Sequence, residues 1–202
     1  YWGIHTARAL ENFPISRRPI SVYADLVRAL AMVKQAAARA NAEIGVLDAE
    51  RAALIDRASQ LVIDGQFHDQ FVVGVVQGGA GTSTNMNANE VITNIALELA
   101  GRPRGDYTYL SPIDHTNRSQ STNDVYPTAI KVGLSLDLQT LLEELDLLRQ
   151  SFLHKATEFH DVLKVGRTQL QDAVPMTLGQ EFHGFATTLG QDYQRLTENA
   201  HL

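Results

Sequence analysis

A long apolar stripe in the second half of the chain most constrains its fold. Its members recur at steps of three and four, close to the helical period, and they are Ile130, Leu134, Leu138, Leu141, Leu145, Leu148, Phe152, Ala156, Phe159 and Leu163. Further leucines at 136, 142, 147 and 153 widen the apolar face. A helix about 50 Å long cannot bury such a face alone. The sequence therefore predicts that this helix, expected over 125–162 with Pro127 in its first turn, belongs to a bundle or an oligomer.

Capping residues, glycines and prolines divide the rest of the chain into shorter segments. The first twenty residues carry Pro14 and Pro19 and no sustained period, so we expect them to be mostly irregular. The expected helices are Val22–Ile44 after a cap at Ser21, Asp48–Asp64 with Asp48 as its cap, Glu90–Ala100, and a last one from Thr177 onward. Between them, Val72–Val76 is expected to be a strand or loop, and 77–89, 102–123 and 164–174 are expected to be polar loops. The last helix shows no stop signal, which predicts that the chain is a fragment.

Composition excludes several classes of partner and site. Lys and Arg number 17 against 23 Asp and Glu, a net charge of −6 that offers no basic face for nucleic acid or for an anionic membrane. Cysteine is absent, which excludes disulfides and thiolate metal sites. The apolar run Phe71–Val76 is far too short to span a bilayer, and no leader is visible. We therefore expect a cytoplasmic protein.

Polar residues gather in three loops that precede expected helices. The loops are Gly79–Asn85, Ser119–Asp124 and Gly166–Val174. Helix starts offer unpaired N–H groups and the positive end of the helix dipole, so they suit anions. Neutral donors in these loops are Thr82, Ser83, Asn85, Ser121, Thr122, Asn123, Thr168 and Gln169. We expect the loops to meet at a site for a small molecule rich in carboxylates. The alternative is that these residues only cap helices and form turns.

Other familiar site patterns are missing from the sequence. The glycines of 78–84 lack the Gly-Lys-Ser/Thr ending of a phosphate loop and the GxGxxG spacing of a dinucleotide site. The seven histidines show no metal-ligand spacing, and no serine lies in a GxSxG turn. His115 lies close enough to Ser121 in sequence to be considered as a base, although a solvated loop histidine is the commoner outcome.

Three sequence blocks resemble those of the aspartase/fumarase superfamily. They are GGAGTSTNMNANEVITN, SQSTNDVYPTA and KVGRTQLQDAVPMTLGQEF, and the opening YWGIHTARALENFPIS also resembles the start of these proteins. The resemblance covers essentially the whole chain. Class II fumarases usually carry SGTQ in the first block and His at the position of Gln169, so this chain looks more like the branch that deaminates aspartate. Argininosuccinate and adenylosuccinate lyases look more distant, since they usually carry another residue at the position of Thr122.

The resemblance implies a site and a fold. It makes Thr82, Ser121, Thr122, Asn123 and Thr168 ligands of the substrate carboxylates and puts Gln169 where fumarases have His. The implied fold is mostly α, with a small N-terminal helical domain over 1–120 followed by the first long helices of a central helical bundle over 121–202. Members of the superfamily are homotetramers, and the resemblance implies active sites that draw the three blocks from three different subunits.

The implied reaction converts L-aspartate to fumarate and ammonia through an aci-carboxylate intermediate, with no cofactor and no metal. The alternatives are a class II fumarase-type hydratase and a non-catalytic structural or assembly member. The signature loop of the superfamily, resembling GSSxMPxKxNP, supplies the Ser base and is not in these 202 residues. We therefore expect the catalytic base to lie outside the chain and the 202 residues alone to be inactive.

Overall fold

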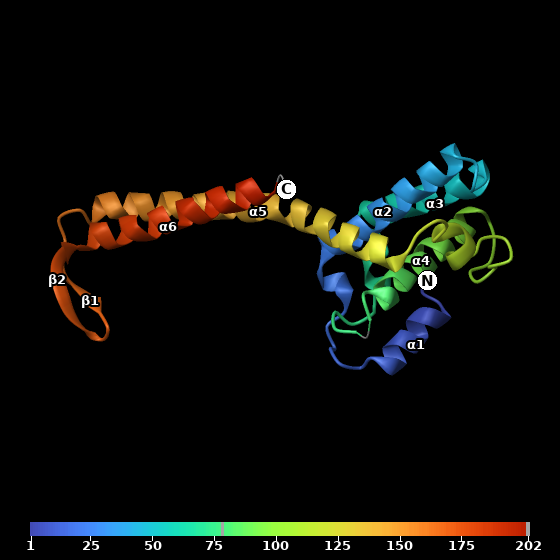
Figure 1. Cartoon of the computed structure of the whole chain (residues 1–202), viewed down its shortest axis with the longest axis horizontal. Coiled ribbons are helices and arrows are strands. Elements are labelled where there is room, and N and C mark those ends of the chain that lie inside the picture. The colour runs from blue at the N-terminus through green and yellow to red at the C-terminus, as the bar shows by residue number, and fades with distance from the viewer. Residues whose placement is uncertain (78, 201–202) are drawn as a thin grey trace. The chain divides into compact units, whose positions relative to one another are not determined.

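The computed structural model describes residues 1–77 and 79–200, and it confirms the mostly α fold (Figure 1). Two compact units divide the chain, Tyr1–Leu134 and Ser135–Leu202. The first holds α1 (Ile4–Asn12), α2 (Ala24–Glu43), α3 (Ala49–Ile63), α4 (Thr82–Leu99), short 3₁₀ turns at Ile20–Val22 and His68–Gln70, and a π-helical turn at Pro112–Thr116. Helix α5 (Thr122–Glu158) begins in the first unit and ends in the second, which also holds β1 (Leu163–Thr168), β2 (Gln171–Thr177) and α6 (Leu178–Asn199). The domain boundary expected at residue 120 stays a prediction.

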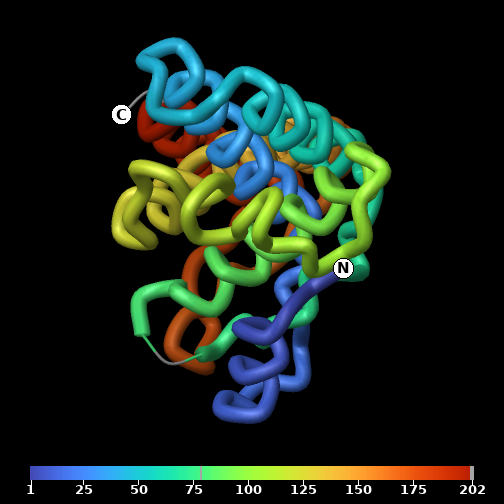
Figure 2. Tube along the Cα trace, turned by 90° about the vertical axis from the view of Figure 1, so that its right-hand side faces the viewer, coloured from blue at the N-terminus to red at the C-terminus, as the bar shows by residue number. Residues whose placement is uncertain are grey.

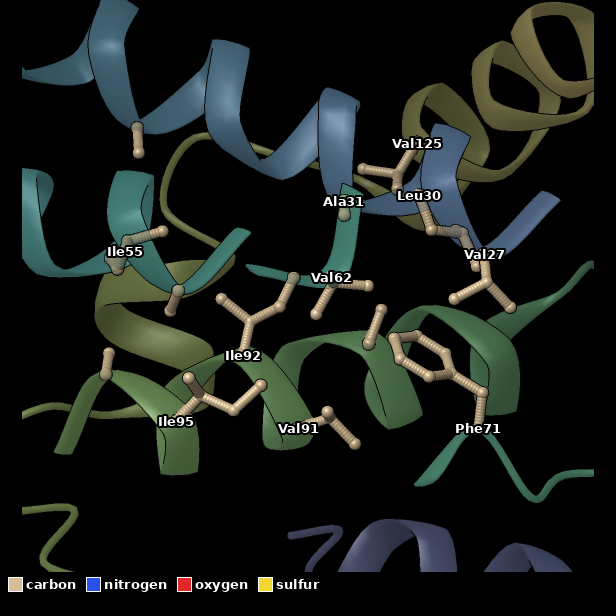
Figure 3. Packing of buried hydrophobic residues seen from close by; sticks show 14 of the residues in the cluster. Val27, Leu30, Ala31, Ile55, Val62, Phe71, Val91, Ile92, Ile95 and Val125 are labelled. Atoms are coloured by element: carbon tan, nitrogen blue, oxygen red, sulfur yellow. The ribbon is translucent and has the colours of Figure 1, made fainter. Parts of the chain in front are cut away.

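The hydrophobic core of the first unit lies between α2, α3 and α4. Helices α2 and α3 run side by side (Figure 2) and α4 packs against both. Figure 3 shows the core residues Val27, Leu30 and Ala31 of α2, Ile55 and Val62 of α3, and Val91, Ile92 and Ile95 of α4, with Phe71 and Val125. Each large aliphatic side chain buried here contributes about 1.5–3 kcal/mol. In the described ranges, no helix combines the length and apolar character needed to cross a membrane.

Helices with a local cap begin close to where the sequence predicts. Asp48 accepts a hydrogen bond of 2.9 Å from the N–H of Arg51 at the start of α3. Thr177 and Gln180 form a reciprocal capping box at the start of α6, with distances of 3.0 and 3.1 Å. The helix expected over Val22–Ile44 is also confirmed, but it begins at Ala24, and Ser21 is not its cap.

The first twenty residues, expected to be mostly irregular, contain one helix that the sequence analysis missed, the nine-residue α1. The carboxylate of Glu90, on α4, accepts the N–H groups of Gly3, His5 and Thr6 at 2.8, 2.8 and 3.1 Å, and the Thr6 hydroxyl at 2.7 Å. These N–H groups lie at the start of α1, where a helix has no partners of its own. A distant carboxylate caps this helix, so no capping residue marks it locally in the sequence.

Helix α4 begins at Thr82, eight residues before the expected start at Glu90, so most of the predicted polar loop 77–89 is helical. Its asparagines are poor helix formers but have partners in neighbouring segments. The Oδ1 of Asn87 accepts the N–H of Val72 at 3.0 Å, and its Nδ2 donates to the Gln70 carbonyl at 3.0 Å. The run Val72–Val76 is a loop with one bridge, between Pro19 and Gly74. Gly78 lies outside the described residues.

The polar loop expected over 164–174 is also a wrong prediction, because it forms the antiparallel hairpin β1–β2. Leu163 pairs with Thr177, and Thr168 pairs with Gln171 at the turn. The two turn residues, Gln169 and Leu170, have φ of 51° and 62°. Left-handed turns of this kind usually carry Asn and Gly, so the hairpin lacks its usual sequence signal.

In the second unit, α5 and α6 pack through a cluster of four phenylalanines. Phe152 and Phe182 have ring centroids 5.8 Å apart, and Phe159 and Phe185 complete the cluster at 5.6–6.0 Å. Large apolar side chains nevertheless stay exposed on this unit, namely Leu141, Leu147, Leu148, Val162, Leu163, Val165, Leu170, Val174, Phe185 and Tyr193. The stripe is therefore only partly covered within one chain. Since α5 begins at Thr122, Pro127 lies in its second turn and not in its first.

Candidate dicarboxylate site

The start of α4 presents free hydrogen-bond donors. Gly81 precedes the helix with a left-handed φ of 88°, which favours glycine. Among the described residues, the N–H groups of Thr82 and Ser83 and the exposed Thr82 hydroxyl have no hydrogen-bond partner, whereas the N–H of Thr84 donates to Gln77 Oε1 at 3.3 Å. An unpaired helix start of this kind favours an anion.

The start of α5 carries the second group of predicted site residues. The Oγ of Ser121 accepts the N–H of Asn123 at 3.2 Å, and the carboxylate of Asp124 accepts the N–H of Ser121 at 3.3 Å. Ser121 therefore caps the helix, as the alternative interpretation holds. Its hydroxyl proton is still available, because a hydroxyl can accept and donate at once.

The two helix starts meet through one hydrogen bond. Asn85 Nδ2, on α4, donates to Thr122 Oγ1 at 3.1 Å. The Thr122 oxygen thus accepts from inside the protein, which leaves its own proton to donate outward. The first two predicted loops therefore come together within a single chain. Which subunits supply the three blocks to one site stays a prediction.

A pocket of about 440 Å³ lies beside this junction. Its lining residues are Val75, Val76, Gln77, Gly79, Ala80, Gly81, Asn123, Tyr126 and Pro127. The ring of Tyr126 packs so closely on Gly81 that a Cβ there would lie 2.3 Å from the ring. Pro127 has no N–H, so the Asn123 carbonyl lacks its usual helical partner. The described lining carries no charged side chain, and its polar side chains are Gln77, Asn123 and Tyr126.

The third predicted group, Thr168 and Gln169, lies at the exposed turn of the β1–β2 hairpin. Thr168 ends β1, and Gln169 is the first of the two left-handed turn residues. Both belong to the second compact unit, whereas the other predicted site residues belong to the first.

Lys34 is a polar residue of this region that the sequence interpretation missed. Its side chain is 0% exposed, and its ammonium donates to Asn117 Oδ1 and Gln120 Oε1, each at 2.9 Å. Burial lowers the pKa of Lys34 to about 7. A signal was present, because Lys34 shares the buried face of α2 with Leu30 and Ala38, four residues before and after it.

His115 is not placed as a base for Ser121. Its Nδ1 accepts the N–H of Ser111 at 2.8 Å within the π-helical turn, an arrangement that favours the neutral ring. Burial also lowers the pKa of His115. Within residues 1–77 and 79–200, no group of three His, Asp or Glu side chains could hold a metal ion.

A protein-family model described as "Lyase" matches residues 1–201. The chain belongs to this lyase family. The match confirms the resemblance to the aspartase/fumarase superfamily. The lyase chain is 62% identical to the aspartate ammonia-lyase of Pseudomonas aeruginosa over 97% of its own length and 41% of that relative. It is 50% identical to the aspartate ammonia-lyase of Escherichia coli over 100% of its length and 42% of that relative.

Solved structures also match the chain. The lyase chain superimposes on "fumarate lyase:delta crystallin" from Brucella melitensis with a TM-score of 0.93 and 55% identity, over 100% of this chain and 47% of that one. A class II fumarase from Schistosoma mansoni matches with a TM-score of 0.81 and 36% identity, over 96% and 41% of the two chains. The lyase chain therefore spans less than half the length of the relatives it matches.

Proposed function

We propose that the protein is an aspartate ammonia-lyase, which eliminates ammonia from L-aspartate to give fumarate. A proton leaves the carbon beside the side-chain carboxylate, whose charge grows as an aci-carboxylate forms. The α-ammonium group then departs as neutral ammonia, taking the electron pair of the carbon–nitrogen bond. The observation that carries the proposal is the meeting of two donor-rich helix starts through the Asn85–Thr122 hydrogen bond. The 62% identity to a curated aspartate ammonia-lyase supports the same reaction.

Neutral donors suit this chemistry. Backbone N–H groups and hydroxyls strengthen their hydrogen bonds as the substrate gains charge, and they need no proton transfer to do so. In our proposal Thr82, Ser121, Thr122 and Asn123 bind one part of the dicarboxylate. Thr168 and Gln169 bind another part from a second subunit, in a homotetramer with shared sites. The base that removes the proton is supplied from outside these 202 residues.

The domain assignment is part of the proposal. Residues 1–120 form an N-terminal lyase domain and 121–202 the opening helices of a central bundle. Apolar side chains exposed on the second unit, such as Leu141 and Leu148, support burial against other subunits. The cytoplasmic location expected from the sequence stays a prediction.

Replacing Thr82 by alanine tests the donor assignment. In the protein at its natural length, Thr82→Ala is expected to cost about 1–3 kcal/mol of transition-state binding, because a donor to a charged group is lost. Thr168→Ala is expected to have a similar effect. Steady-state kcat/KM for L-aspartate measures both. The control is Thr108→Ala on an exposed loop, where, among the described residues, the hydroxyl bonds to Asp106 alone. Unchanged kcat/KM in both site variants would refute the assignment.

Substrate choice separates deamination from hydration. Hydroxide is a poor leaving group that needs a general acid, a role His can fill and Gln169 cannot. Ammonia leaves as a neutral molecule and needs no such donor. We therefore expect the protein at its natural length to release fumarate from L-aspartate and to leave L-malate unchanged, as followed by the ultraviolet absorbance of fumarate. Efficient conversion of malate would favour the fumarase-type alternative, and no turnover of either substrate would favour the non-catalytic one.

A further inference from the structure

Lys34 is a buried cation without a carboxylate partner. It lies on the inner face of α2, and no Asp or Glu of the described chain forms an ion pair with it. Burial lowers the pKa of Lys34 to about 7, so the free protein holds this side chain partly as the neutral amine near neutral pH. On the neighbouring turn, Asp114 and Arg118 are exposed and His115 bonds to Ser111. Burying a charge without a partner costs free energy, so a lysine at this buried position needs a structural or functional explanation.

The two partners of the ammonium hold the segment that leads into α5. Asn117 Oδ1 accepts Lys34 Nζ at 2.9 Å, and it also accepts the Nδ2 groups of Asn85 and Asn89, each at 3.1 Å. Gln120, the second partner, directly precedes Ser121, and its own carbonyl accepts Asn117 Nδ2 at 3.1 Å. The ammonium therefore organises the turn from which the second group of site residues emerges.

A short chain of hydrogen bonds joins Lys34 to the candidate site. The ammonium bonds to Asn117, Asn117 bonds to Asn85, and Asn85 bonds to the Thr122 hydroxyl. The cluster is also incompletely satisfied, since the buried Oδ1 atoms of Asn85 and Asn89 accept no hydrogen bond from the described residues.

We propose that Lys34 is a positioning residue whose ammonium is the buried positive charge of the dicarboxylate site, with the bound substrate as its counter-ion. The inference rests on the proposed function. Through Asn117 and Asn85 the ammonium orients the Thr122 hydroxyl, and its charge favours the dianion over a neutral ligand. Because the two charges attract, binding of the dianion raises the proton affinity of Lys34, and the protein takes up protons on binding near neutral pH.

The test measures binding of succinate, an unreactive dicarboxylate, to the protein at its natural length. Calorimetry at pH 7.5 in two buffers of different ionisation enthalpy gives both the affinity and the number of protons taken up. The wild type is expected to bind succinate with proton uptake. Lys34→Met is expected to fold, because it removes an unpaired buried charge, to bind succinate about tenfold more weakly or worse, and to take up fewer protons.

A second variant keeps the test independent of whether Lys34→Met folds. Asn117→Asp supplies the ammonium with a counter-ion of its own, although it loses the Nδ2 donor to the Gln120 carbonyl. We expect this variant to fold, to lose about tenfold in succinate affinity and to take up fewer protons on binding. Wild-type affinity in a folded variant of either kind would overturn the role of Lys34, as would wild-type binding without proton uptake. If either of these overturning results occurs while the wild type still turns over L-aspartate, the role of Lys34 fails and the proposed function stands. If the wild type neither binds succinate nor consumes aspartate, the proposed function fails with it.

Discussion

Replacing Gly81 by alanine is expected to lower kcat/KM for L-aspartate by more than about a hundredfold. Its φ of 88° disfavours any side chain, and the added Cβ would lie 2.3 Å from the Tyr126 ring. Either Tyr126 or the 79–81 loop must move, and both line the pocket beside Asn123. Displaced donors at the start of α4 lose their alignment with developing charge. Steady-state kinetics on the protein at its natural length measures the effect.

The matched control is Gly65→Ala. Gly65 has nearly the same φ, 92°, but a Cβ there would meet no atom within 4 Å. It follows α3, away from the pocket-lining residues. We expect this variant to lose about 1 kcal/mol of stability and to keep its activity. Equal activity losses in the two variants would show that backbone strain alone, and not the contact with Tyr126, explains the result.

Replacing Glu90 by glutamine is expected to destabilise α1 by about 2–4 kcal/mol, because an amide cannot accept at both ends of the group and buried donors lose their partner. Glu90 accepts from Gly3, His5 and Thr6, so the loss falls on the start of this helix. Amide hydrogen exchange of residues 4–12 is expected to quicken roughly a hundredfold. The control is Glu98→Gln on α4, because the Glu98 carboxylate accepts an exposed hydrogen bond from the Tyr1 hydroxyl. Equal exchange in both variants would contradict the capping role.

The same carboxylate gives α1 a defined pH dependence. Burial alone would raise the pKa of Glu90, but hydrogen bonds from the Thr6 hydroxyl and from the N–H groups of His5 and Gly3 outweigh it and hold the pKa below its ordinary value of 4.5. The stabilisation is therefore fully present above pH 4.5 and is lost as the pH falls through the lower pKa of the folded state. In Glu90→Gln the titrating carboxylate is gone, so the stability of α1 is expected not to fall over this acidic pH range.

Sequence patterns predict those elements of the fold that carry their own signals. Helix α3 begins after a cap at Asp48 and α6 after a cap at Thr177, and both caps are visible in the sequence. The missed or misplaced elements depend on partners far along the chain. Glu90 caps α1 from 84 or more residues away, and Asn87 of α4 finds its partners in the 70–73 loop. Local propensity cannot register such contacts.

The candidate site shows the same division. Three loops of neutral donors were predictable as an anion site, and two of them meet at Asn85 and Thr122. The sequence analysis did not predict that Lys34 is buried next to these loops, because it resembles an ordinary lysine of an alanine-rich helix. Only its position on the buried stripe of α2, between Leu30 and Ala38, distinguishes it. The helical period can place a lysine on the buried face of its helix. It cannot give the hydrogen-bond partners of that lysine, because these come from other parts of the chain.

A crystal structure of the protein at its natural length with bound succinate tests the central claim most directly. We expect one succinate carboxylate to accept hydrogen bonds from Thr82 and from Ser121–Asn123 of one subunit, with Thr168 of another subunit contacting the ligand and Lys34 lying behind Asn117. Succinate bound elsewhere, with the helix starts of α4 and α5 unoccupied, would contradict the account.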